Sequence, residues 1–181
     1  AKQLLGDRYT SIHGYVLEKQ LTACRDELSE FGVEFNCWFS EQSLFDSGKI
    51  DSVIRDLDDK GYLYIENGAR WFKSTDFGDE KDRVVQRDNG AFTYFASDIA
   101  YHVDKFKRGF DTVINIWGAD HHGYVPRVRA ALSALGVCDL ESNKLRVPLV
   151  QFAVLYREGQ KLAMSTRSGE FVTLEELRKD V

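Results

Sequence analysis

Three segments of this chain combine side-chain types that could form a binding or catalytic site. The first, residues 118–123, reads Gly-Ala-Asp-His-His-Gly. It offers a carboxylate for ribose hydroxyls and imidazoles for phosphate, or alternatively ligands for a metal ion. A simpler interpretation is that Asp120 caps the following helix while His121 and His122 satisfy backbone groups. The residues alone leave these interpretations open.

The second segment, residues 161–169, is a cationic loop of small residues that follows an apolar run. Such a loop can fold over a polyphosphate, with Arg167 and backbone N–H groups binding its negative charge. The alternative is a solvated surface turn.

The third segment holds Tyr94 and Asp98, four residues apart at the predicted junction of a strand and a helix. Asp98 either complements the positive end of that helix or is a partly buried carboxylate that binds a cationic ligand, with the Tyr94 hydroxyl beside it. The run of charges at residues 79–83 is expected on the solvated surface. The scattered cations could contact phosphates, but in an acidic chain they favour surface solvation; they are Lys105, Lys107, Arg108, Arg127 and Arg129.

The elements that must position these segments are predicted from the spacing of apolar residues. Helices are expected over residues 12–31, 48–60, 97–108 and 124–135. Ser97 is the expected N-cap of the third of these helices, and a short strand is expected over residues 33–39. Residues 61–95 read as two β-hairpins that turn at residues 66–68 and at Asn89-Gly90, a dipeptide that favours a type I′ turn.

From residue 96 the pattern is typical of an α/β fold. Residues 112–117 and 147–156 read as buried strands on either side of a helix, which predicts a parallel sheet covered by helices. Ligands of such sheets bind beyond the carboxyl ends of the strands. We therefore expect residues 118–123 and 164–169 to lie at the site.

Composition indicates an ordinary globular domain, with 43% hydrophobic residues, 29% charged residues and a net charge of −5. The longest apolar stretch, residues 147–156, is interrupted by Pro148 and Gln151 and is far short of the roughly 20 residues that a membrane helix needs. The three cysteines show no C-x-x-C spacing, which favours a reducing cytosol over a disulfide frame or a zinc site. The only methionine is Met164, so we expect a piece of a longer chain.

In this order, residues 93–102 (TYFASDIAYH), 118–124 (GADHHGY) and 164–169 (MSTRSG) resemble the second half of the catalytic domain of bacterial arginyl-tRNA synthetases, which are class I synthetases. Residues 68–71 (GARW) and 78–83 (GDEKDR) fit the same pattern. The resemblance implies an α/β fold, with part of a Rossmann-like parallel sheet and a small antiparallel β-rich insert. It also implies a helical connecting part over residues 1–60, the insert over 61–95 and the second half of the catalytic domain over 96–181.

The resemblance further implies that the parent enzyme activates arginine with ATP, releases diphosphate and transfers arginine to tRNA(Arg), releasing AMP. Members of this family generally need bound tRNA for the activation step. Mg²⁺ would enter with ATP, and we expect no metal held by the protein. The expected partners are tRNA(Arg), arginine, ATP and the missing parts of its own chain, in the cytoplasm and away from membranes.

Residue by residue, the resemblance places Tyr94 and Asp98 against the arginine substrate. The adenosine and amino-acid pocket would be lined by Gly118, Asp120, His121 and His122. A loop similar to the KMSKS signature would stabilise the diphosphate in the transition state. Its catalytic residues would be Lys161, Met164, Ser165, Thr166 and Arg167.

Two departures from the family pattern stand out. Ala163 and Thr166 occupy the lysine positions of the signature, so Lys161 or Arg167 would have to supply the positive charge. The chain also contains no H-x-G-H signature and no helical anticodon-binding domain. We therefore expect the isolated chain to be inactive.

Two alternatives remain open from the residues. A DHH-type metal-dependent phosphoesterase would use Asp120, His121 and His122 as ligands, but it needs further aspartates, and Asp56 and Asp58 lie on a predicted helix. The altered signature would also suit a non-catalytic, synthetase-like protein that binds nucleic acid or a partner.

Overall fold

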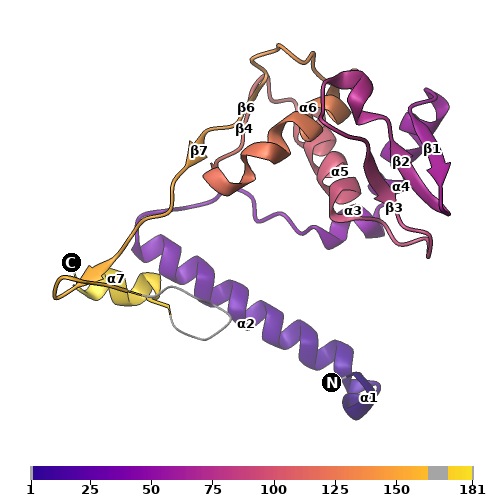
Figure 1. The fold of residues 1–181 in the computed structure, drawn as a ribbon. Coiled ribbons are helices and arrows are strands. Elements are labelled where there is room, and N and C mark those ends of the chain that lie inside the picture. The colour runs from indigo at the N-terminus through magenta and orange to yellow at the C-terminus, as the bar shows by residue number, and fades with distance from the viewer. Residues whose placement is uncertain (1, 163–170, 181) are drawn as a thin grey trace. The chain divides into compact units, whose positions relative to one another are not determined.

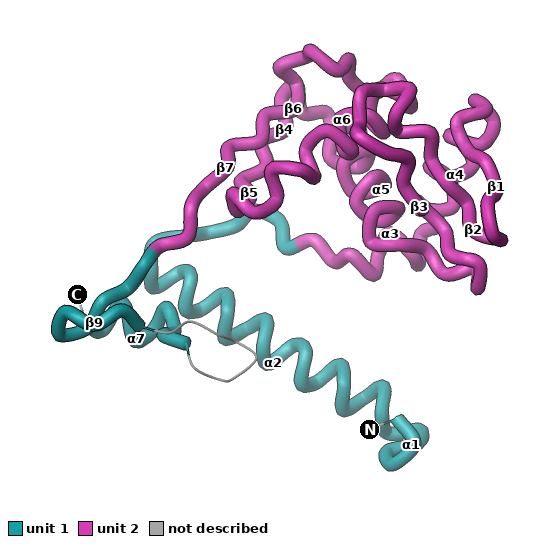
Figure 2. The backbone as a smooth tube through the Cα atoms, in the orientation of Figure 1, with its two compact units in different colours: residues 1–38, 154–181 teal, residues 39–153 magenta. Residues whose placement is uncertain are grey.

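A computed structural model describes residues 2–162 and 171–180. These residues form two compact units (Figure 2). Residues 39–153 make up the central unit, and the described parts of residues 1–38 and 154–181 make up the terminal unit. Tyr94, Asp98 and residues 118–123 all belong to the central unit.

The helices and strands of the central unit (Figure 1) contribute to one hydrophobic core. The α-helices are α3 (Gln42–Asp46), α4 (Lys49–Asp59), α5 (Tyr94–Lys107) and α6 (Val125–Ala134). The 3₁₀ helices are η1 (Ser74–Phe77) and η2 (Ala119–Tyr124). The strands are β1 (Leu63–Glu66), β2 (Ala69–Phe72), β3 (Arg83–Gln86), β4 (Val113–Ile114), β5 (Trp117–Gly118), β6 (Leu145–Arg146) and β7 (Leu149–Val150).

The core packs α4, α5 and α6 with the sheet that contains β2 and β3. Leu57 of α4, Phe72 of β2, Ile99 of α5 and Leu132 of α6 are fully buried. The helices predicted over residues 48–60 and 124–135 are confirmed as α4 and α6, because their apolar residues form one continuous buried face.

Strands β1, β2 and β3 form an antiparallel sheet in that order. The turn between β1 and β2 is Asn67-Gly68, whose φ angles of 50° and 78° are those of a type I′ turn. The first predicted hairpin is therefore confirmed. A type I′ turn needs a positive φ at both central residues, and asparagine and glycine adopt this backbone conformation more readily than other residues.

The second predicted hairpin is wrong in its turn type. Gly90 has a positive φ of 81°, whereas Asn89 does not. The side-chain Oδ1 of Asn89 instead accepts a hydrogen bond from the backbone N–H of Ala91 at 3.0 Å. This local Asx-type bond replaces the type I′ geometry, and pairing is reduced to a bridge between Gln86 and Phe92.

Two short parallel pairs, β4 with β6 and β5 with β7, confirm the predicted parallel arrangement. The predicted strands are nevertheless too long. The strand expected over residues 112–117 is interrupted at Asn115-Ile116, and only Leu149 and Val150 of residues 147–153 lie in a strand of the central unit. The prediction of a buried strand over 147–156 is wrong, because side chains such as Phe152 are exposed.

Helix α5 begins earlier than predicted, because Thr93 and not Ser97 is its N-cap. The Thr93 hydroxyl accepts a hydrogen bond from the backbone N–H of Ala96 at 3.4 Å and donates to the Val84 carbonyl of β3 at 2.9 Å. The cap thus joins the helix to the antiparallel sheet, and Ser97 lies buried inside the helix.

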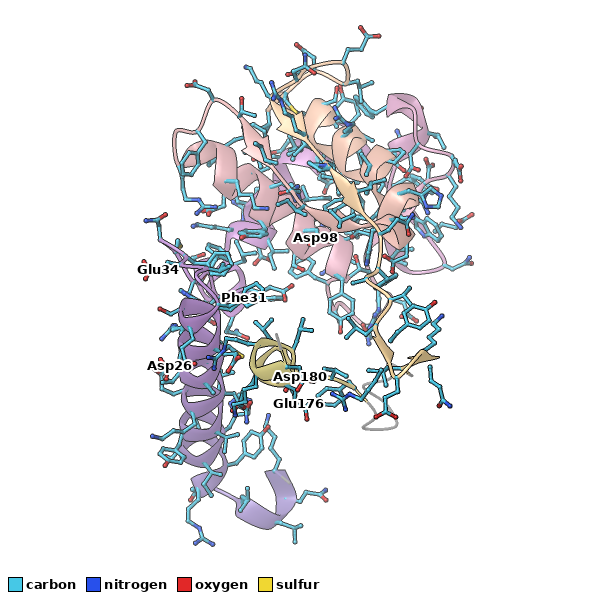
Figure 3. The ribbon with its side chains drawn as sticks, turned by 90° about the vertical axis from the view of Figure 1, so that its left-hand side faces the viewer. Asp26, Phe31, Glu34, Asp98, Glu176 and Asp180 are labelled. Atoms are coloured by element: carbon cyan, nitrogen blue, oxygen red, sulfur yellow. The ribbon has the colours of Figure 1, made fainter. Side chains whose placement is uncertain are left out.

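The terminal unit consists of α1 (Lys2–Leu5), α2 (Arg8–Glu30), β8 (Tyr156–Arg157), β9 (Gln160–Lys161) and α7 (Leu174–Asp180). Helix α7 lies beside α2 (Figure 3), with Arg178 paired to Glu27 at 3.4 Å and also to Glu30. The helix predicted over residues 12–31 is confirmed, although none of its side chains is buried. The strand predicted over 33–39 is wrong, because these residues have no regular structure. Within the described ranges, no helix has both the length and the apolar character needed to cross a bilayer.

Candidate functional site

Two cavities of the central unit share Tyr94 and Asp98 as lining residues. The carboxylate cavity, about 400 Å³ in volume, is also lined by Phe39, Glu41, Ser97 and Tyr101. The loop cavity, about 420 Å³, is also lined by Ile116, Trp117, Gly118, His121 and Tyr124. The structure therefore brings together four of the predicted binding residues, Tyr94, Asp98, Gly118 and His121.

Asp98 projects from the second turn of α5 (Figure 3), so the interpretation as a charge at the helix end is wrong. Its Oδ2 accepts a hydrogen bond of 2.6 Å from the hydroxyl of Tyr124, and Tyr94 lines the same two cavities. Burial raises the pKa of the Asp98 carboxyl, the Tyr124 hydrogen bond opposes this rise and the charge of Glu41 adds to it. Asp98 is therefore a carboxylate that gains from a cationic partner.

Tyr124 is held by three neighbours. Its ring meets those of Trp117 and Phe95 edge-to-face, with centroids 5.8 and 6.1 Å apart, and the Arg127 guanidinium lies 4.5 Å from its centroid. Burial and the neighbouring Asp98 carboxylate raise the pKa of Tyr124 far above its usual value. The phenol therefore stays protonated and donates to Asp98.

A second carboxylate in the carboxylate cavity belongs to Glu41, just before α3. The buried hydroxyl of Ser97 donates to Glu41 Oε1 at 2.6 Å and fixes this side chain against α5. Glu41 could not be found from local sequence patterns, because its partner lies 56 residues later in the chain. The role of Tyr124 was not predicted either. The available signal was its residue type, since a tyrosine between a polar loop and a helix combines an apolar ring with a hydroxyl donor.

The lining of the carboxylate cavity suits a planar cation. Two carboxylates come from separate segments, and the described lining residues include no lysine or arginine. A guanidinium presents a planar fork of donors to a carboxylate. An ammonium group has no such fork. The rings of Phe39 and Tyr101 stack on each other, with centroids 4.5 Å apart, and form an apolar side of the cavity. The cavity is thus chemically matched to a guanidinium group.

The predicted loop at residues 118–123 forms the 3₁₀ helix η2 with its N-cap, Gly118. A Cβ at Gly118 would lie 2.5 Å from Asp120 Oδ1, so a glycine lets the two residues approach. Asp120 makes no capping bond and lies 3.6 Å from His121 Nε2, so its interpretation as a helix cap is wrong. His122 is exposed with its Nδ1 3.2 Å from the Ala119 carbonyl, and neither Asp120 nor His122 lines the two cavities.

The signature-like residues are not located relative to these cavities. Lys161 belongs to β9 of the terminal unit. The other predicted catalytic residues lie outside the described ranges. These are Met164, Ser165, Thr166 and Arg167.

Several charges predicted to lie on the solvated surface have defined partners instead. Asp79 is buried and forms a bidentate pair with Arg83, with N–O distances of 2.6 and 2.7 Å. Arg129 of α6 donates to backbone carbonyls of residues 140–145, including that of Leu145 at 2.8 Å. Charge patterns along the sequence did not reveal these contacts, because their partners are set by the tertiary fold.

Among the described residues, no group of three or more His, Cys, Asp or Glu side chains is placed to hold a metal ion. Asp120, His121 and His122 therefore do not form the metal cluster that the phosphoesterase alternative needs within this part of the chain.

Comparison with known proteins identifies the family. Residues 11–180 match the family model described as the catalytic domain of class I tRNA synthetases (R). An arginine–tRNA ligase from Azoarcus sp. (strain BH72) is 63% identical over all 181 residues, and one from Dechloromonas aromatica (strain RCB) is 65% identical. The chain spans 30% of the length of each of these relatives.

Solved structures agree with this assignment. A crystal structure described as an arginyl-tRNA synthetase from Campylobacter jejuni superimposes with a TM-score of 0.86 and 34% identity, covering 97% of this chain and 37% of that one. The Thermus thermophilus arginyl-tRNA synthetase, at 20% identity and a TM-score of 0.58, shares the fold. The comparisons support neither the phosphoesterase nor the non-catalytic alternative, and they confirm the resemblance and the predicted fold class. The chain belongs to the catalytic domain family of class I arginyl-tRNA synthetases.

Proposed function

We propose that this chain supplies the arginine pocket of an arginine–tRNA ligase. The parent enzyme would form arginyl-adenylate and diphosphate from arginine and ATP, with Mg²⁺ entering as part of the ATP substrate. It would then transfer arginine to tRNA(Arg) and release AMP. The observation that carries this proposal is the pair of carboxylates, Asp98 and Glu41, in one aromatic-walled cavity.

In this proposal the guanidinium group of arginine lies between Asp98 and Glu41. Tyr124 occupies one side of the Asp98 carboxylate and Ser97 holds Glu41, so both acceptors are oriented before the substrate arrives. Lysine is rejected because its ammonium cannot satisfy two fixed carboxylates with a planar fork.

The rest of the substrate would extend toward the loop cavity. Tyr94 and Asp98 line both cavities, so a molecule bound at Asp98 also faces the side that Gly118 and His121 form. We assign this side to the reacting end of arginine and to the adenosine of ATP. Asp120 and His122 retain a proposed role at its rim. Lys161 and residues 164–167 are proposed to bind the diphosphate.

The pocket is tested by calorimetric titration of the 181-residue chain with L-arginine, L-lysine and L-citrulline. Arginine is expected to bind, and the other two to bind much more weakly, because neither offers a charged planar fork. Asp98→Asn and Glu41→Gln should each abolish measurable arginine binding. Asp82→Asn is the matched control, because Asp82 accepts hydrogen bonds from Thr75 away from both cavities. Equal binding of arginine and citrulline would contradict the proposed pocket.

Catalysis is tested in a longer chain. Replacing the matching segment of the Azoarcus arginine–tRNA ligase with these 181 residues should preserve arginylation of tRNA, because the two segments are 63% identical. In that chimera, Asp98→Asn should lower kcat/KM for arginine by an amount equivalent to about 2–5 kcal/mol, the cost of breaking a buried charged hydrogen bond. An unchanged kcat/KM would overturn the role of Asp98.

The 181-residue chain alone is expected to show no arginine-dependent ATP–diphosphate exchange. Class I activation depends on several positioning groups, and the H-x-G-H signature does not occur in this chain. A clear exchange rate above background would contradict this expectation without bearing on arginine binding.

A further inference from the structure

A network of hydrogen-bonded side chains connects two walls of the loop cavity, helix α5 and the segment that leads into β5. His102 of α5 is 2% exposed and Asn115, between β4 and β5, is 5% exposed. The Nε2 atom of His102 lies 2.6 Å from Asn115 Nδ2, and its Nδ1 lies 2.7 Å from the carbonyl oxygen of Asp98. Lys105 Nζ lies 2.7 Å from Asn115 Oδ1. The contacts used in the proposed function involve none of His102, Lys105 and Asn115.

Lys105 determines which atom donates in each hydrogen bond of this side-chain network. Its ammonium group has only donors, so the atom of Asn115 that faces it must be the acceptor Oδ1. The Nδ2 group of Asn115 therefore donates to His102 Nε2, which must be unprotonated. The single proton of a neutral imidazole is then on Nδ1, where it donates to the Asp98 carbonyl. Burial lowers the pKa of His102 to about 4, which agrees with a neutral ring.

The side-chain network is held in place at both Asn115 and His102. The backbone N–H of Asn115 donates to the Arg146 carbonyl at 2.9 Å, so its position is set by the parallel pairing. Ile116 and Trp117, the next two residues, form one wall of the loop cavity, and Asp98 of α5 belongs to another. His102 also meets the Trp117 ring edge-to-face, with centroids 6.1 Å apart. Lys105 lies 4.1 Å from the ring centroid of Tyr101, which lines the carboxylate cavity.

We propose that His102 and Asn115 are positioning residues that set the separation between Asp98 on α5 and the strand end that carries Trp117 and Gly118. The expected effect on arginine affinity rests on the proposed function, whereas the hydrogen-bond pattern is independent of it. A purely apolar contact could hold the two walls together but would not fix their register, whereas two directional hydrogen bonds on one imidazole do.

Two substitutions of Asn115 separate positioning from mere packing. Asn115→Leu keeps the approximate volume but removes both side-chain hydrogen bonds, so the two walls are expected to lose their register. Asn115→Asp keeps both contacts if the imidazole takes a second proton and donates from Nε2 to the carboxylate. The aspartate variant is therefore the conservative rescue. Ile54→Val, in the buried face of α4, is the control for a general loss of packing.

The first measurement needs no ligand and uses NMR of the 181-residue chain at pH 7. We expect the wild-type His102 ring to be neutral with its proton on Nδ1, and cross-relaxation between the rings of His102 and Trp117 to be visible. In Asn115→Leu this cross-relaxation should disappear. In Asn115→Asp it should persist with a doubly protonated ring. A wild-type ring with its proton on Nε2, or a charged one, would overturn the inference.

The second measurement is L-arginine affinity by calorimetry. We expect Asn115→Leu to lose at least about tenfold in affinity while remaining folded by circular dichroism, and Asn115→Asp to stay within about threefold of the wild type. If Asn115→Leu binds arginine as well as Ile54→Val does, the positioning role is overturned. If the wild type does not bind arginine but the NMR results are as expected, the proposed function fails and the positioning of the two walls stands.

Discussion

Asp98 and Glu41 place two carboxylates in one cavity, where Asp98 is half-buried and Glu41 is exposed to solvent. Each carboxylate accepts a hydrogen bond from a hydroxyl group, Tyr124 for Asp98 and Ser97 for Glu41. These bonds orient the carboxylates but supply no positive charge. Without substrate, the charge of the half-buried Asp98 therefore lowers the stability of the fold, and arginine binding would recover that stability.

The first prediction concerns stability against pH in Asp98→Asn. Because burial raises the folded-state pKa of Asp98 above 3.8, its stabilising contribution is present below pH 3.8 and is lost as the pH rises through the folded-state value. At pH 7 the asparagine variant should therefore melt at a higher temperature than the wild type, although it cannot bind arginine. The difference should vanish below pH 3.8.

Asp82→Asn is the matched control for this prediction. Burial opposes ionisation of Asp82, but hydrogen bonds from Thr75 outweigh it and hold the pKa of Asp82 below 3.8. Its stabilising contribution is therefore present above pH 3.8 and lost as the pH falls through the folded-state value, so this variant should melt lower at pH 7. Thermal unfolding followed by circular dichroism tests both signs. A lower melting temperature for Asp98→Asn would show that its ionised form is stabilised in the fold.

The second prediction concerns Tyr124→Phe. Removing the hydroxyl leaves Asp98 without its fixed donor, and a hydrogen bond to a charged group contributes about 1.5–3 kcal/mol. Arginine affinity at pH 7 should fall at least about tenfold, which corresponds to about 1.4 kcal/mol. The Tyr124 bond also lowers the pKa of Asp98, so the loss of affinity on acidification should begin at a higher pH in the variant.

Tyr64→Phe is the control for Tyr124→Phe, because Tyr64 is also hydrogen-bonded to an aspartate, Asp82, outside both cavities. Isothermal titration across pH 5–8 compares the two variants. Equal affinities for arginine in both variants would contradict the role assigned to Tyr124.

At the scale of elements, α5 does most to form the site. It supplies Tyr94 and Asp98 to both cavities, and its His102 is hydrogen-bonded to Asn115 in the β4–β5 connection. Its start is fixed by Thr93, which contacts β3. The orientation of Asp98 therefore depends on both the antiparallel sheet and the parallel pairs.

The third prediction is an acid-sensitive step in the stability of the central unit. Burial lowers the pKa of His102 from 6.5 to about 4, so the stability due to its neutral form is present above pH 6.5 and is lost as the pH falls through about 4. The loss amounts to about 3 kcal/mol. Urea unfolding at pH 7 and pH 4.5 should show most of this change in the wild type.

In His102→Gln this step should be absent, because glutamine does not titrate. Carboxylates with lowered pKa values, such as Asp79 and Asp82, lose their stabilising contribution below pH 3.8, outside this interval. Because the raised pKa of Asp98 changes stability within it, the comparison is repeated with Asp98→Asn in both proteins. An unchanged difference between pH 7 and pH 4.5 in His102→Gln would assign the step to another group.

Hydrophobic periodicity predicted the helices α2, α4 and α6 because each has repeating apolar positions within one continuous segment. It failed for the N-cap of α5, which depends on the contact of Thr93 with β3, and for residues 147–156, where apolar side chains do not mean burial. Asp98 could be proposed from its residue type and from the family resemblance. The partnership of Glu41 with Ser97 depends on tertiary structure, so local patterns did not reveal it.

At the scale of the whole molecule, the core and both cavities belong to the central unit. The fully buried hydrophobic residues of the described chain run from Leu44 to Leu145, and the cavity linings run from Phe39 to Tyr124. None of the described helices of the terminal unit has a buried side chain. The predicted boundaries at residues 60 and 95 remain predictions.

The fourth prediction follows from this distribution. A chain limited to residues 39–153 should fold with a single cooperative transition, because it retains the hydrophobic core. It should bind L-arginine within about threefold of the 181-residue chain, a difference of less than 1 kcal/mol. Differential scanning calorimetry and titration calorimetry measure the two properties. Loss of cooperative folding would show that the terminal unit contributes to the central core.

Trp117 provides an intrinsic fluorescent probe of the loop cavity. Its indole lines that cavity and touches the Tyr124 ring, whereas Trp71 belongs to β2 and Trp38 to the terminal unit. A charged or stacking ligand that enters beside Trp117 changes the polarity around one indole of the three in the chain. Its fluorescence should therefore report occupancy directly, so that binding can be followed in unlabelled protein, and Trp71→Phe should leave the signal change intact.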